Sequence, residues 1–320
     1  MIKMNKRKFF MLAVIIMAAA LSACGKKEEK QETNNGKINV VATIFPEYDF
    51  LRQIAGDRIN LTMLLAPGAE SHSYEPTPQD ILNVQNANLF VYVGGDSDVW
   101  VSGILDSMDQ SNMKIVTLMD CVDLVEEETV EGMEPEEEEG DSGEAEMDEH
   151  VWTSPRNAVL IVRKLSDELC AADPDNAREY RENTEKYIKE LENLNQEFRD
   201  VVDNGVRKEI IVGDRFPFRY FTDAYGLSYY AAFPGCSTDT EASAATVAFL
   251  IDKIKEDDIP VVFHIELSNE QMCDSICSAT GARKELLNAV HNVSKDDFEA
   301  GVTYLDLMEH NVEVLKEALN

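Results

Sequence analysis

The stretch that decides the organisation of this chain is residues 173–205, DPDNAREYRENTEKYIKELENLNQEFRDVVDNG. Asp173-Pro174 is typical of a helix start and Asn204-Gly205 of a helix end. Between them, apolar residues recur at spacings that share one helix face: Tyr180, Tyr187, Leu191, Leu194, Phe198 and Val201. A helix of about 30 residues would span about 45 Å. That length suits a strut between two lobes, although an ordinary core helix would carry the same stripe.

On both sides of this helix the chain alternates short β-rich runs with amphipathic segments, which favours parallel sheets. The predicted strands are 38–44, 59–65, 89–93, 114–118, 209–213, 228–233, 260–264 and 286–290. The predicted helices are 47–55, one starting at Pro78, 99–108, 156–171, 217–225, 242–255, 269–280 and 301–319. We therefore expect an α/β fold with two lobes, 38–173 and 207–320, whose parallel-type sheets are flanked by helices and joined by one long rigid helix, 174–206.

The N-terminus reads as an export signal. Four basic residues precede an apolar run, Phe9 to Ala20, which is shorter than the ~20 residues that span a bilayer. The segment closes with Leu21-Ser22-Ala23-Cys24-Gly25, which resembles a bacterial lipobox. We predict that residues 1–23 are a lipoprotein signal peptide, that Cys24 is lipidated and that 24–37 is a flexible tether. The protein would then be extracytoplasmic and anchored to the cell membrane.

The charge excludes one class of partner. Removing residues 1–23 takes four basic residues from a chain of net charge −32, which leaves −36. Such a chain repels nucleic acid and attracts cations. Residues 126–149 hold fourteen Asp or Glu and no Lys or Arg, so we expect a disordered acidic loop there. Five cysteines besides Cys24 make an odd number for a disulfide framework, and we expect mostly small buried residues.

The histidines give the candidate site. His72 lies in the turn-rich stretch Pro67 to Pro76, His150 ends the acidic run and His291 follows the apolar run 286–290. Imidazole is a common ligand of zinc, and metal sites often draw ligands from loops on a rigid scaffold. We predict that these three histidines bind a metal ion.

Four polar residues in the second lobe lie near the expected carboxyl ends of strands, where ligands gather in open α/β sheets: Asp214, His264, Glu266 and His291. Asp214 is the preferred fourth ligand, with Glu266 and His264 as alternatives. His264 alternates with Val262 and could instead be a core residue.

Several motifs resemble the zinc- and manganese-binding lipoproteins of bacterial ABC importers, the cluster A-I metal-binding family. They are Val41 to Pro46, the loop Gly68 to Pro76, Glu149-His150-Val151-Trp152, Tyr220 to Leu227 and Thr303-Tyr304-Leu305. The resemblance runs from Ile38 to the C-terminus. It implies two α/β lobes joined by a rigid helix, one metal between them, delivery to a membrane permease and no catalysis.

The resemblance also implies ligands. The first two of the family carry over to His72 and His150. The third falls shortly before Tyr220-Phe221, where this chain has Asp214 and Arg215, and the fourth lies before the last helix, nearest His291. The chain departs from the family pattern at both of these positions.

Three imidazoles and one carboxylate suit Zn²⁺, with manganese or iron second. We expect a monomer that is not an enzyme. A secreted zinc hydrolase is the alternative, but Pro76 and Pro78 prevent the helix that a His-Glu-x-x-His motif needs. A secondary role as a surface adhesin stays open. The acidic loop is either a cation-gathering antenna or a solvated spacer.

Overall fold

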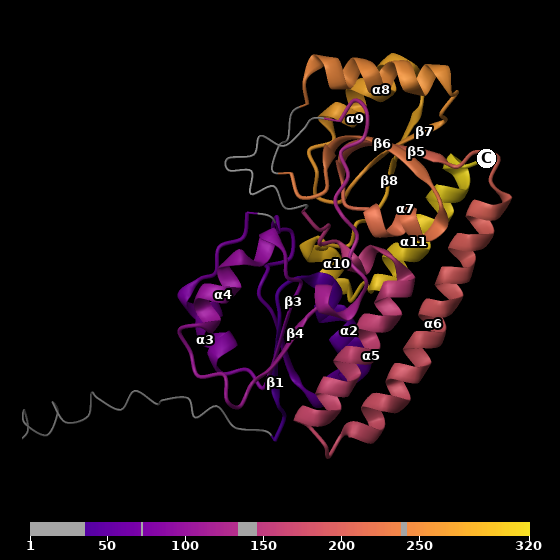
Figure 1. Ribbon diagram of the computed structural model, residues 1–320. Helices are drawn as coiled ribbons and strands as arrows, with labels where there is room; N and C mark the ends of the chain where they lie inside the picture. The colour runs from indigo at the N-terminus through magenta and orange to yellow at the C-terminus, as the bar shows by residue number, and fades with distance from the viewer. Residues whose placement is uncertain (1–35, 72, 134–145, 238–241) are drawn as a thin grey trace, which may run out of the picture. The chain divides into compact units, whose positions relative to one another are not determined.

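The structure, a computed structural model, describes residues 36–71, 73–133, 146–237 and 242–320 (Figure 1). Residues 38–320 form one compact unit, and the segment through Lys37 is a separate unit. His72 and Cys24 lie outside the described residues. Within the described part of the chain, no helix combines the length and apolar character that crossing a bilayer would require.

The first sheet has four parallel strands in the order β2-β1-β3-β4. Their bounds are β1 Asn39–Ala42, β2 Asn60–Met63, β3 Leu89–Tyr92 and β4 Lys114–Thr117. The associated helices are α2 Phe45–Ala55, α3 Pro78–Gln85 and α4 Val99–Leu105. Helix α3 starts at Pro78 as predicted, because Thr77 caps it by accepting a hydrogen bond from Asp80 N.

The second sheet repeats this topology in the order β6-β5-β7-β8, again all parallel. Its strands are β5 Glu209–Phe216, β6 Ser228–Pro234, β7 Val261–His264 and β8 Arg283–Leu286. The helices that accompany it are α7 Arg219–Tyr225, α8 Ala244–Glu256, α9 Gln271–Thr280 and α10 Lys295–Ala300. The two parallel sheets flanked by helices confirm the predicted fold class.

Two long helices, α5 Pro155–Ala172 and α6 Ala177–Asn204, lie side by side (Figure 1). At 28 residues, α6 is about 42 Å long. It begins at Ala177, later than predicted. Asp173 precedes the helix, and its carboxylate accepts hydrogen bonds from Tyr180 Oη (2.6 Å) and Asn176 Nδ2 (2.8 Å). The predicted apolar stripe is buried from Tyr180 to Phe198, and the final helix, α11 Tyr304–Ala318, packs against α6.

The main hydrophobic core draws on both sheets. One contiguous cluster contains Val40 and Val91 from the first sheet, Ile210 and Phe263 from the second, and the buried face of α6. A smaller cluster under α8 and α9 covers the opposite face of the second sheet. The inner faces of the two lobes therefore share a core.

The structure corrects the sequence-based elements near His291. The predicted strand 286–290 is wrong: β8 ends at Leu286, and the apolar residues after it form a buried loop. Strand β8 reads Arg-Lys-Glu-Leu and lies at the sheet edge, so its sequence carries no hydrophobic signal. No helix was predicted from the sequence at Lys295–Ala300, where the structure has α10.

The expected disorder of the acidic loop 126–149 is wrong at both of its ends. Glu126 and Met147 form an antiparallel bridge, and Asp148 and Glu149 are buried. Residues 134–145 lie outside the described part of the chain.

Candidate metal centre

His150 is completely buried and lies just before the short 3-10 helix η4, Val151–Thr153, and α5. Two contacts with Asp148 hold this residue in place. One oxygen, Asp148 Oδ1, accepts the backbone N–H of His150 at 2.8 Å and lies 3.1 Å from His150 Nδ1. A proton on Nδ1 that faces a carboxylate leaves Nε2 as the atom with a lone pair. This is how a carboxylate orients a metal-binding histidine.

A second carboxylate, that of Glu266, lies against His291. Glu266 Oε1 accepts the backbone N–H of His291 at 2.8 Å and lies 3.4 Å from His291 Nδ1. The other oxygen, Oε2, accepts Ala289 N–H at 2.7 Å. Glu266 therefore holds the loop through both of its oxygens, and one of them also faces the ring of His291.

The loop that carries His291 is conformationally constrained. Val290 has φ of 63°, a left-handed value that is costly for a β-branched residue. Trp152 Nε1 donates to Ala289 O at 2.8 Å, which fixes the loop from the first lobe. The strained backbone turns His291 toward His150.

The two imidazoles form a perpendicular pair. Their ring centroids are 4.8 Å apart with an interplanar angle of 81°. Burial lowers the pKa of His150, but the nearby carboxylates of Asp148, Glu149 and Glu127 outweigh it and raise its pKa above the ordinary value. Burial holds the pKa of His291 well below its usual range, with further lowering by the charge of His150. The neutral form of His291 is therefore favoured, and neutral imidazole is the form that binds metals.

The loop around residue 72 is tied to the His291 segment. Gly68 N–H donates to Val293 O at 2.8 Å, and Asn292 Nδ2 donates to Ala66 O (2.8 Å) and Ala69 O (2.9 Å). Glu70 forms an ion pair with Arg215 at 2.9 Å. These contacts hold residues 66–70, which precede residue 72 in the loop, against the second lobe.

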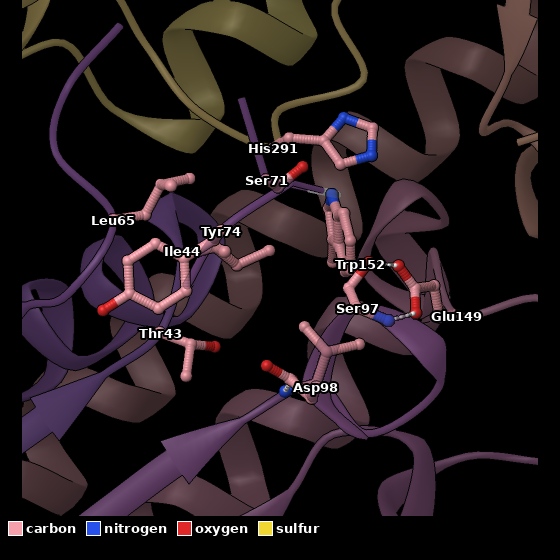
Figure 2. A pocket seen from close by; sticks show the side chains of 11 residues that line it. Thr43, Ile44, Leu65, Ser71, Tyr74, Ser97, Asp98, Glu149, Trp152 and His291 are labelled. Carbon is pink, nitrogen blue, oxygen red and sulfur yellow. Dashed lines mark hydrogen bonds between the residues drawn. The ribbon is translucent and has the colours of Figure 1, made fainter. Parts of the chain in front are cut away.

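A small cavity lies beside the pair. Figure 2 shows that Ser71 and Tyr74 line it together with Glu149, Trp152 and His291. Ser97 donates to Glu149 through its backbone N–H (3.1 Å) and through its hydroxyl. Residue 72 is thus flanked in sequence by residues that line the same cavity as His291.

The residues of the second lobe that were considered as metal ligands lie in different surroundings. Strand β5 has an irregularity between Val212 and Arg215. Arg215 reaches Glu70 and Ser237 O, and its charge acts on His291. Asp214 instead accepts the backbone N–H of Arg215 and acts electrostatically on the thiol of Cys273 in α9, which belongs to the smaller core.

His264 is also oriented elsewhere. Its Nδ1 lies 3.1 Å from Ile265 O, and its charge acts on Glu270. The structure therefore brings His150 and His291 together with Glu266 behind them, and it gives Asp214 and His264 other surroundings. Sequence reasoning missed Asp148 as an orienting group, because it was one acid among many.

Two parallel sheets that meet around buried, carboxylate-oriented histidines define a two-lobed α/β protein of the solute-binding type. Residues 40–318 match the family described as zinc-uptake complex component A, periplasmic (ZnuA), and the chain belongs to this family.

Three similar proteins illustrate the match. The high-affinity zinc uptake system protein ZnuA of Bacillus subtilis is 34% identical over 90% of this chain and 89% of its own length. The metal-dependent lipoprotein YcdH of Bacillus subtilis superposes with a TM-score of 0.76 at 33% identity, over 89% of this chain and all of that one. The Zn(II)-bound ZnuA-like domain of Streptococcus pneumoniae AdcA gives 0.74 at 29% identity, over 89% of this chain and 99% of that domain.

Proposed function

We propose that this chain is the extracytoplasmic component of a bacterial ABC importer that binds Zn²⁺ between its two lobes and delivers it to the membrane permease. The observation that carries the proposal is the perpendicular pair His150 and His291, each with its Nδ1 facing a carboxylate oxygen that also accepts its backbone N–H. Membership in the zinc-uptake family and the similarity to a protein named for high-affinity zinc uptake support it.

We propose His72, His150 and His291 as the ligands. The contacts of Glu70 and of Asn292 hold the loop that contains residue 72 beside the His291 segment, which supports the first of these. Glu266 is assigned to orientation because both of its oxygens accept backbone N–H groups. Asp214 and His264 are not retained as ligands, because their contacts belong to other parts of the second lobe.

Zinc is the proposed cargo and manganese the alternative. A site rich in imidazole favours zinc, whereas manganese prefers oxygen ligands. We further propose that Cys24 carries a lipid anchor, that the protein acts as a monomer and that it catalyses no reaction. The similarity to a metal-dependent lipoprotein supports the anchor.

The test is a zinc titration of the metal-free protein against a competing chromophoric chelator. His150→Ala and His291→Ala should each weaken zinc binding by about 100-fold or more, because each removes a direct ligand and loss of an outer-shell group alone costs about 10–100-fold. His264→Ala is the control, because His264 lies in the same lobe as His291, and this variant should bind zinc like the wild type. A His291→Ala variant with unchanged zinc affinity would exclude this site.

A further inference from the structure

A second group of metal-binding side chains includes His150. One ligand atom each from Glu149, His150 and Cys236 can be chosen so that all three lie within 4.8 Å of one another. Glu149 and His150 come from the acidic segment of the first lobe, whereas Cys236 follows strand β6 of the second. The thiol therefore approaches the proposed zinc site from the lobe opposite to His150.

The loop that carries Cys236 is fixed from two directions. Glu127 Oε1 accepts the backbone N–H groups of Gly235 at 2.8 Å and Cys236 at 3.3 Å. Arg215 Nη1 donates to Ser237 O at 3.3 Å while its other contacts hold Glu70. The backbone around Cys236 is thus held directly to the acidic segment and, through Arg215, to the loop that carries Glu70.

Gly235 shows how closely this loop approaches the imidazole. A Cβ at this position would lie 2.9 Å from His150 Cε1 and 2.9 Å from Phe216 O, closer than real Cβ contacts allow. Only glycine lets the backbone pack against the ring at this distance. The next residue along the chain is the cysteine.

We propose that Cys236 Sγ is a zinc ligand that acts together with His150, and this inference rests on the proposed function. At a tetrahedral angle, Zn–S and Zn–N bonds of about 2.3 and 2.1 Å place the two ligand atoms about 3.6 Å apart. Because the ligand atoms lie within 4.8 Å of one another, a shift of at most about 1.2 Å reaches that distance. Glu149 is assigned to positioning, because Ser97 binds its carboxylate through both its hydroxyl and its backbone N–H.

Zinc binding by Cys236 exchanges a proton for the metal ion. Zinc displaces the thiol proton of Cys236, which passes to solvent, and a Zn–S bond forms with no change of oxidation state. A soft thiolate stabilises zinc much more than manganese, which prefers carboxylate and carbonyl oxygens. Cys236 therefore acts as a determinant of metal specificity in the second lobe.

Cobalt(II) is the direct probe, because a Co–thiolate bond gives an intense near-ultraviolet charge-transfer band that His and carboxylate ligands do not give. The full chain in detergent, loaded with Co²⁺, should show this band, and Cys236→Ser should lose it. Cys121→Ser is the matched control, since Cys121 is also half-buried, and it should keep the band. Zinc should displace the cobalt.

Affinities give the second measurement. Cys236→Ser should weaken zinc binding by about tenfold or more, as loss of a ligand does, and leave manganese binding within about twofold. If the wild-type protein binds cobalt and zinc but shows no charge-transfer band, Cys236 is not a ligand and the proposed function stands. If the wild type binds neither metal, the proposed function itself fails. The wild-type spectrum decides between these outcomes even if the variant does not fold.

Discussion

At the scale of single residues, the same arrangement of a carboxylate and a histidine occurs twice in the site. Asp148 and Glu266 each accept the backbone N–H of a histidine with the same oxygen that faces its Nδ1. This arrangement fixes the position of the residue and the orientation of its ring together. It also leaves the Nε2 atom of each ring on the side away from its carboxylate.

The Asp148 contact gives a testable consequence. Asp148→Asn keeps the shape of the side chain but removes the charge that stabilises and orients His150. We expect zinc affinity to fall by about 10–100-fold, the usual effect of losing such an outer-shell group, with the fold intact. Glu131→Gln makes the same charge change at an exposed position of the same segment. Chelator competition would measure both variants, and equal affinities for Asp148→Asn and wild type would contradict the orienting role.

Asp98 predicts a pH dependence of stability. It is buried and accepts the N–H groups of Val93 and Gly94, and burial raises its pKa from 3.8 to about 7. Between about pH 4 and pH 7 the folded state therefore binds a proton that the unfolded state has lost. The contribution of Asp98 to the free energy of unfolding is complete below about pH 4 and decreases as the pH rises to about 7.

Asp98→Asn removes this titration. Relative to wild type, the variant should gain on the order of a few kcal/mol in unfolding free energy between pH 4 and pH 8. Urea unfolding of the metal-free protein at several pH values would measure the gain. Asp96→Asn, an exposed change in the same turn, should not alter the pH profile. Parallel profiles for Asp98→Asn and wild type would show that Asp98 does not titrate in this range.

The residues that sequence reasoning could identify are those in distinctive local contexts. His150 and His291 stood out because histidine is rare in this chain, and because His150 ends the acidic run and His291 follows the apolar run 286–290. Asp214 was preferred over Arg215 on chemical type, but adjacent strand residues alternate in direction, and here Arg215 is the one that reaches the histidine loops. The proximity of Cys236 to His150 depends on contacts between distant parts of the chain, which no local pattern carries.

At the scale of helices and strands, predictions succeeded where a regular hydrophobic pattern extends over many residues and failed where it covers only a few. Helix α6 carries 28 residues of regular amphipathic pattern, so its buried stripe could be predicted from sequence. Strand β8 has four residues, three of them charged, and the apolar run after it is buried in a loop. In that loop, tertiary contacts with Trp152 and Glu266 determine the conformation instead of strand pairing.

The end of strand β6 gives a prediction at this scale. Gly235→Ala would place a Cβ 2.9 Å from both His150 Cε1 and Phe216 O. The resulting displacement should cost about 1–3 kcal/mol of unfolding free energy and weaken zinc binding. Gly103→Ala is the contrasting change, because nothing lies within 4 Å of its added Cβ and it sits in helix α4. It should stabilise the protein by about 0.5–1 kcal/mol. Thermal and urea unfolding would measure both, and a neutral Gly235→Ala would mean that the β6 loop can move away from the ring.

At the scale of the whole molecule, the acidic segment is both structural and electrostatic. Its described ends carry Glu127, which holds the Cys236 loop, and Asp148, which orients His150. Deleting all of Glu126 to Asp148 would therefore damage the site whatever the rest of the segment does. A test of cation gathering has to leave both ends in place.

Residues 134–145 are the part to change, because they hold seven carboxylates and lie outside the described residues. Replacing those seven acids with Gln preserves the length of the segment and both of its ends. We expect the equilibrium zinc affinity to stay within about twofold, while the association rate at low ionic strength falls several-fold, since a negative surface raises the local concentration of cations. At high salt the two rates should converge, because charges beyond about 10 Å are screened at 0.1 M. Stopped-flow zinc binding at two salt concentrations would measure this, and identical rates at low salt would make the segment a solvated spacer.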